Sequence, residues 1–165
     1  MKPARAELLE TNIKERALDA QRHIEALELA ASEFGDDFDI DAFEKAWRSS
    51  APEELRKALA VQAGYENVLN TCIKIAQELS ELEGWTPANA EPSSVDALKH
   101  LQQNGVIGSS TRAALKDAQE RRSDVQHDYV HVAARDVHMS VRAVLEHAPV
   151  LLQGTADQFR QRTGS

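Results

Sequence analysis

The segment ERRSDVQHDYVH, residues 120–131, gathers side chains that can carry charge or move protons. Asp124, His127 and His131 recur at intervals of three and four residues, which would place them on one face of a continuous helix. Carboxylate and imidazole groups spaced in this way are ligands that zinc accepts. The chain has no recognisable second group of such ligands, so we expect neither a metal site nor a cofactor.

Arg122 and His127 suggest a different chemistry, the metal-free cleavage of a phosphodiester. Histidine titrates near neutral pH and can take a proton from a 2′-hydroxyl, while arginine presents a permanent charge and a planar fork to phosphate oxygens. Their spacing of five residues sets them about 140° apart on an ideal helix, at about 100° per residue. They converge only if the helix kinks, the arginine side chain bends round, or a second subunit completes the site.

A solvated helix face is the third interpretation of this segment. Arg121 or Arg122 could pair with a neighbouring carboxylate, and such exposed pairs contribute little to stability. On composition and spacing alone, this interpretation outweighs both chemical ones.

Amphipathic helices dominate the rest of the chain and must position this segment. A first helix is expected over residues 4–34, because apolar side chains recur there at three- and four-residue steps: Leu9, Ile13, Ala17, Ala20, Ile24, Leu27 and Ala31. Further helices are expected over residues 39–48, 52–83 and 95–103, from residue 109 or 110 through the motif, and from about 136 to near Pro149. The sequence thus predicts an all-α, antiparallel helical bundle of four to five main helices. We expect the bundle to be a single domain, residues 1–152, followed by a flexible C-terminal tail, residues 153–165.

Composition and charge restrict the function further. The net charge of −8 argues against a protein that coats nucleic acid generally, because phosphates would repel it. Residues 112–142 hold six basic and five acidic side chains, whereas the rest of the chain holds 13 basic and 22 acidic ones. The single cysteine, Cys72, fits a reducing compartment, and no apolar run approaches the length of a membrane span. We therefore expect a cytoplasmic protein that does not associate with membranes.

The spacing of Arg122, His127 and Tyr129 resembles the R-xxxx-H-x-Y signature of the HEPN superfamily. The order of the expected helices, over about residues 8–152, is similar to that of HepT-like toxins from prokaryotic toxin–antitoxin pairs. The resemblance implies a HEPN-type bundle and a homodimer in which two copies of the motif helix face each other across a cleft. It also implies metal-independent cleavage of RNA, and it would resolve the awkward spacing of Arg122 and His127.

The resemblance implies a role for each residue of the motif. His127 would be the catalytic base, and Arg122 would bind the scissile phosphate and stabilise its transition state. Arg121 could assist at a neighbouring phosphate. Ser123 stands where the family often has asparagine, and a hydroxyl offers less than an amide for orienting the site. Asp124 either orients the arginine or histidine, or is solvated.

Tyr129 would have a separate role. In HepT-like toxins the motif tyrosine accepts nucleotides from a cognate minimal nucleotidyltransferase antitoxin, and the added negative charge would keep RNA out of the cleft. The family also includes members that only bind nucleotides or partners. An inactive module that docks onto a nucleotidyltransferase or another defence protein is therefore the alternative. His131 and His138 are expected at ordinary surface positions.

Overall fold

The computed structural model describes residues 1–87, 89–127 and 134–164, and the side chains of all of these except residues 123–127. Six helices and no strands occur within these ranges. They are α1 (Pro3–Ser32), α2 (Ile40–Trp47), α3 (Pro52–Leu82), α4 (Ser94–Gln103), α5 (Ser109–His127) and α6 (Ala134–Thr163). The predicted all-α helical bundle is confirmed.

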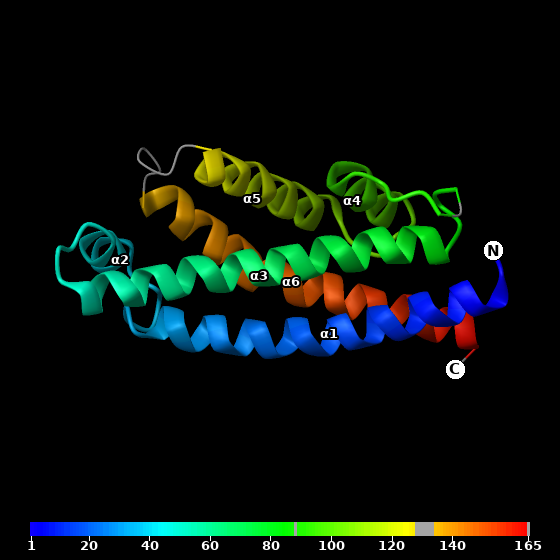
Figure 1. Cartoon of the computed structure of the whole chain (residues 1–165), viewed down its shortest axis with the longest axis horizontal. Helices are drawn as coiled ribbons and strands as arrows, with labels where there is room; N and C mark the ends of the chain where they lie inside the picture. Colours follow the sequence, from blue (N-terminus) through cyan, green and yellow to red (C-terminus); the bar gives the residue numbers. More distant parts are fainter. Residues whose placement is uncertain (88, 128–133, 165) are drawn as a thin grey trace.

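The three longest helices, α1, α3 and α6, run the length of the molecule (Figure 1). α1 and α3 are antiparallel neighbours, and α6 packs against both of them. α4 and α5 lie along one side of this layer, where α5 packs mainly on α6 and α4 on α3. α2 covers the end of the bundle that lies opposite the two termini. Each long helix can therefore bury one apolar face against its neighbours.

The apolar periodicity of α1 correctly predicts the face that the helix buries. Six of its residues are at most 4% exposed: Leu9, Ile13, Ala20, Ile24, Leu27 and Ala31. This face packs against α3, whose own buried side chains continue the same core. Burying one large aliphatic side chain contributes roughly 1.5–3 kcal/mol, so this seam provides a large part of the driving force for folding.

Two short helices begin at the polar caps that their sequences suggest. The Asp39 carboxylate accepts the N–H of Ala42 at 2.7 Å at the start of α2. The Ser93 hydroxyl accepts the N–H of Asp96 at 3.1 Å at the start of α4. Each bond satisfies an amide that has no partner within the first turn.

Two helical glycines lie where another segment comes very close. A Cβ added at Gly64 in α3 would lie 3.0 Å from Cδ1 of Leu27 in α1. A Cβ added at Gly154 in α6 would overlap the carbonyl oxygen of Val106 and lie 3.0 Å from its carbonyl carbon. The second approach joins α6 to the loop just before α5, so it helps to set how α5 sits on α6.

The C-terminal segment differs from the expected flexible tail. α6 continues through Pro149 to Thr163, and Thr155 within the added part is 2% exposed. The Arg162 guanidinium bonds to Glu83 at 2.8 Å and to Glu10 at 3.3 Å. Proline removes one backbone hydrogen bond and crowds the carbonyl four residues earlier, and these contacts with α1 and the end of α3 offset that cost. The helical domain therefore extends beyond residue 152.

No helix in the described portion of the chain is long and apolar enough to cross a membrane.

Candidate functional site

The motif helix α5 has an inner and an outer row of residues. The inner row passes from the fully buried Leu115 through position 119 to the partly buried Arg122. The outer row holds the exposed Asp117 and Glu120. Since α5 is helical as far as His127, the backbone sets Arg122 and His127 of one chain about 140° apart around the helix axis.

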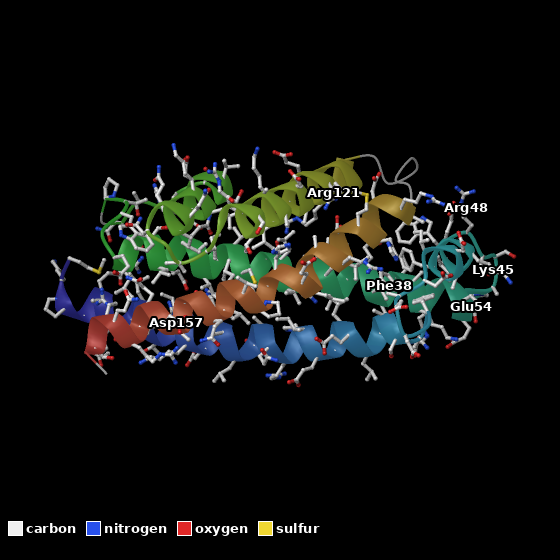
Figure 2. All side chains as sticks on the ribbon, turned by 180° about the vertical axis from the view of Figure 1, so that it is seen from behind. Phe38, Lys45, Arg48, Glu54, Arg121 and Asp157 are labelled. Carbon is white, nitrogen blue, oxygen red and sulfur yellow. The ribbon has the colours of Figure 1, made fainter. Side chains whose placement is uncertain are left out.

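Arg121 links α5 to α6 (Figure 2). Its Nε donates a hydrogen bond to Oγ of Ser140 at 2.8 Å, and Ser140 is fully buried. A partly buried guanidinium held in this way has a fixed position, and its remaining N–H groups can serve other acceptors.

Tyr65 of α3 lies beside both arginines and is fully buried. Burial raises the pKa of its hydroxyl to about 12, and the Glu66 carboxylate adds to this, while the charges of Arg122 and Arg121 oppose it. Ser140 approaches the hydroxyl closely enough to lower the pKa, but without the geometry of a hydrogen bond. Tyr65 is therefore neutral at physiological pH and cannot act as the counterion of the arginines.

Neither Arg121 nor Arg122 has a carboxylate partner among the side chains that the structure describes. The Nε of Arg122 is buried and has no hydrogen-bond partner there. Two neighbouring cations that have no carboxylate partner among the described side chains can bind an anionic ligand, because such a ligand would lower their mutual repulsion.

Arg122 also lines a groove of about 400 Å³ between α1, α3 and α5, which we call the α3–α5 groove. Its polar lining consists chiefly of three cations and three amides: Arg16, Lys74, Arg122, Asn70, Gln77 and Gln119. None of the described residues that line it is acidic. In a chain with a net charge of −8, this is a local concentration of positive charge and hydrogen-bond donors.

Several predicted site residues fall where the structure gives no side-chain position. Ser123, Asp124 and His127 belong to α5 by their backbone only, and Tyr129 and His131 lie outside the described residues. The structure therefore brings together Arg121, Arg122 and their surroundings. It does not test the placement of the remaining motif residues.

The metal hypothesis also rests on these residues. Among the side chains that are described, no group of three histidines, cysteines or carboxylates could hold a metal ion. The proposed ligands Asp124, His127 and His131 are not among them.

His138 corrects the expectation of an ordinary surface position. It is 8% exposed, its Nε2 lies 2.6 Å from the carbonyl oxygen of Phe38, and its ring stacks on that of Phe38 at 4.4 Å. Phe38 itself has a positive φ of 49°, which a bulky residue rarely adopts. The imidazole therefore holds the turn between α1 and α2 onto α6, and its role is structural.

Sequence reasoning did not identify four residues that surround the arginine pair. Tyr65, Ser140, Arg16 and Lys74 come from three different helices. The positions of Arg16 and Lys74 on otherwise ordinary amphipathic helices carry no local signal. Only the packing of α1, α3 and α6 brings them near the end of α5.

Comparison of the chain with known protein families, characterised proteins and solved structures found no match.

Proposed function

We propose that the chain is a metal-independent endoribonuclease toxin of the HEPN type, whose site is completed by a second copy of the chain. The motif of Arg122, His127 and Tyr129 suggests this activity. The structural observation that supports it best is the arginine pair, Arg121 and Arg122. These two cations lie side by side at the end of the motif helix, without a described carboxylate partner and next to a groove lined by further donors.

In the proposed reaction, His127 takes the proton of a ribose 2′-hydroxyl, and the resulting oxygen attacks the adjacent phosphorus. The bond to the 5′-oxygen of the next nucleotide breaks, and a 2′,3′-cyclic phosphate forms. Arg122 binds the non-bridging phosphate oxygens, where negative charge accumulates in the transition state. Water returns a proton to the leaving 5′-oxygen, and His127 later releases its proton to solvent.

A second copy of the chain is part of the proposal because of the geometry of α5. Arg122 and His127 lie about 140° apart around the axis of α5, so one straight helix does not direct both at one phosphate. A two-fold axis beside the end of α5 would bring Arg122 of one copy towards His127 of the other.

Regulation of this activity would involve Tyr129 and an antitoxin. We propose that a cognate minimal nucleotidyltransferase transfers nucleotides to the Tyr129 hydroxyl. The added phosphates would repel RNA electrostatically from the neighbouring arginines.

The experiment is cleavage of a 5′-labelled RNA by purified protein in the presence of EDTA. Wild type is expected to cleave, and His127→Ala and Arg122→Ala are expected to lose activity while keeping a helical circular dichroism spectrum. His23→Ala and Arg22→Ala, two substitutions in α1 that neither belong to the motif nor line the α3–α5 groove, are the matched controls and should retain activity. Equal degradation by wild type and both motif variants would show contamination and refute the proposal. No cleavage by any of them would favour the inactive partner-binding module.

Complementation tests the composite site. Mixed dimers of Arg122→Ala and His127→Ala chains keep one intact pairing of Arg122 with His127. An equal mixture of the two variants should therefore regain about one quarter of wild-type activity, because half of the dimers are mixed and each holds one of two sites. A mixture as inactive as its components would exclude a site shared between copies in this way.

A further inference from the structure

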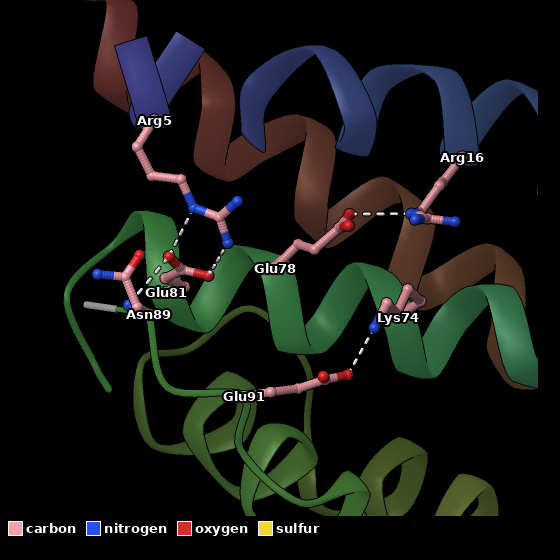
Figure 3. Close-up of polar contacts among 7 residues, drawn as sticks. All are labelled: Arg5, Arg16, Lys74, Glu78, Glu81, Asn89 and Glu91. Atoms are coloured by element: carbon pink, nitrogen blue, oxygen red, sulfur yellow. Dashed lines mark hydrogen bonds and ion pairs between the residues drawn. The ribbon is translucent and has the colours of Figure 1, made fainter. Parts of the chain in front are cut away.

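The α3–α5 groove has a charge distribution that neither the motif nor the proposed reaction explains. Arg16 and Lys74 line it together with Arg122, and the carboxylates that pair with the first two lie outside it. Figure 3 shows Arg16 paired with Glu78 and Lys74 paired with Glu91. Both carboxylates line a neighbouring pocket. Among the described residues, the groove lining therefore contains cations and amides but no carboxylate, while both carboxylates line the neighbouring pocket, which shares Lys74 and Gln77 with the groove.

Both flanking cations keep donors for a further ligand. Arg16 uses its Nε for the bond of 3.0 Å to Glu78, and its two terminal nitrogens make no hydrogen bond with the residues described. The Lys74 ammonium donates to Glu91 at 2.5 Å and carries two more N–H groups. The Glu91 side chain is 63% exposed, so this pair is a weak one that an anion can rearrange at little cost.

Two side chains of α5 carry unpaired polar atoms of opposite kinds: Nε of Arg122 is a donor that suits a phosphate oxygen, and Oε1 of Gln119 is an acceptor that suits a ribose hydroxyl. Oε1 of Gln119 and Nε of Arg122 are buried at this groove, and neither has a hydrogen-bond partner among the described residues. Buried polar atoms are nearly always paired, so their presence one turn apart indicates a polar binding site rather than a packing seam. A volume of about 400 Å³ falls within the range of small-ligand sites.

We propose that the α3–α5 groove binds the backbone phosphates of single-stranded RNA beside the scissile phosphate, with Arg16 and Lys74 as the binding residues. This inference rests on the proposed function, because it assigns the scissile phosphate to Arg122. Arginine and lysine together suit a chain of phosphates, and the amides can bond to ribose hydroxyls or base edges without requiring one sequence. The groove would thus hold the RNA strand on one side of the cleavage point.

Binding is measured separately from cleavage, by fluorescence anisotropy of a labelled 12-nucleotide RNA on the His127→Ala chain. Adding Arg16→Gln or Lys74→Gln is expected to weaken binding roughly five- to tenfold each, since each removes a charge-assisted contact at a partly exposed position. Adding Glu91→Gln should instead strengthen binding about two- to threefold, because it releases Lys74 from a competing carboxylate. If the Lys74–Glu91 pair were purely structural, Lys74→Gln and Glu91→Gln would not change RNA affinity in opposite directions.

Lys116→Gln is the matched control, because Lys116 pairs with Glu120 on α5 and does not line the groove. Losing both Arg16 and Lys74 should also reduce the slope of log affinity against log salt by about 1.4, at about 0.7 per contact with single strands. The inference is overturned if Arg16→Gln and Lys74→Gln weaken binding no more than Lys116→Gln does. Displacement of the RNA by AMP at an equal phosphate concentration would assign the groove to mononucleotides and would also overturn it.

The two proposals fail in different ways. If the groove variants change RNA affinity but wild type does not cleave, the ribonuclease proposal is wrong and the phosphate-binding groove stands. If wild type cleaves RNA, and the Arg16→Gln and Lys74→Gln variants cleave it with the same KM as wild type, the groove inference alone is wrong.

Discussion

Substitution of Gly154 by alanine tests the close approach that fixes α6 against the loop before α5. The added Cβ would overlap the carbonyl oxygen of Val106, and it would lie 3.0 Å from the carbonyl carbon and 3.1 Å from Cγ1 of the same residue. Ordinary contacts begin at 3.4 Å, and two of these three atoms belong to the backbone. The methyl group can therefore be accommodated only if α6 and the loop move apart.

Two opposing effects set the expected magnitude. Alanine is favoured over glycine in a helix interior by about 1 kcal/mol, which alone would stabilise the variant. Overpacking typically costs about 1–3 kcal/mol, and the upper end applies because a backbone carbonyl cannot rotate out of the way as a side chain can. The net loss is therefore about 2 kcal/mol. For a chain of this size, that lowers the Tm by roughly 4–8 °C.

Thermal unfolding followed by circular dichroism measures this loss, with Gly64→Ala as the matched control. Both changes add a methyl group in a helix interior, but at Gly64 the nearest atom is the flexible end of Leu27. Gly64→Ala should stay within about 1 kcal/mol of wild type, because the gain in helix propensity and the adjustment of Leu27 nearly cancel. A Tm for Gly154→Ala equal to or above that of wild type would refute the reasoning about this contact.

Two further predictions concern the pH dependence of folding and the C-terminal helix. The hydrogen bond from Arg5 is the main cause that lowers the pKa of Glu81. The ionised Glu81 therefore stabilises the fold fully above the unfolded pKa of about 4.5, and this stability is lost as the pH falls through the lowered folded pKa. Between pH 5 and pH 3 the Tm of wild type should therefore fall more steeply than that of Glu81→Gln, and parallel curves would contradict this assignment. A chain that ends at Leu152 should lose helicity and melt at a clearly lower temperature, because it lacks the contacts of Thr155 and Arg162 with the rest of the bundle. A chain that ends at Thr163 is its control, and equal melting temperatures for the two would restore the interpretation of a flexible tail.

Much of the fold can be predicted from local patterns in the sequence. The apolar stripe of α1, the breaks around Gly35 and Gly105, and the six helices follow from helical periodicity and from glycine at turns with positive φ. The end of α6 could not be predicted in this way. Pro149 is a local signal to stop, whereas the contacts of Arg162 with Glu83 and Glu10 join segments that are 79 and 152 residues apart.

Some residues of the candidate site can likewise be predicted from the sequence, and others only from the fold. Arg122 can be singled out from the sequence because its residue type suits phosphate chemistry, whereas Arg121 follows only from the resemblance to the HEPN motif. The surroundings that give them this character cannot be selected, since Ser140 and Tyr65 lie on α6 and α3. His138 shows the opposite error, because a lone polar residue suggests a surface position until its backbone partner at Phe38 is known.

The sequence alone determines the helical class, the buried faces of the helices and the motif whose chemistry prompts the ribonuclease proposal. These features depend on interactions between residues three or four apart, which are readable without the fold. Only the tertiary structure decides that Arg16 and Lys74 join Arg122 in one groove, and that their carboxylate partners lie outside it. In the local sequence of an amphipathic helix, a charged residue that binds a ligand looks the same as one that only faces solvent. Its role depends on the helix packed beside it, and that information lies in contacts between distant segments.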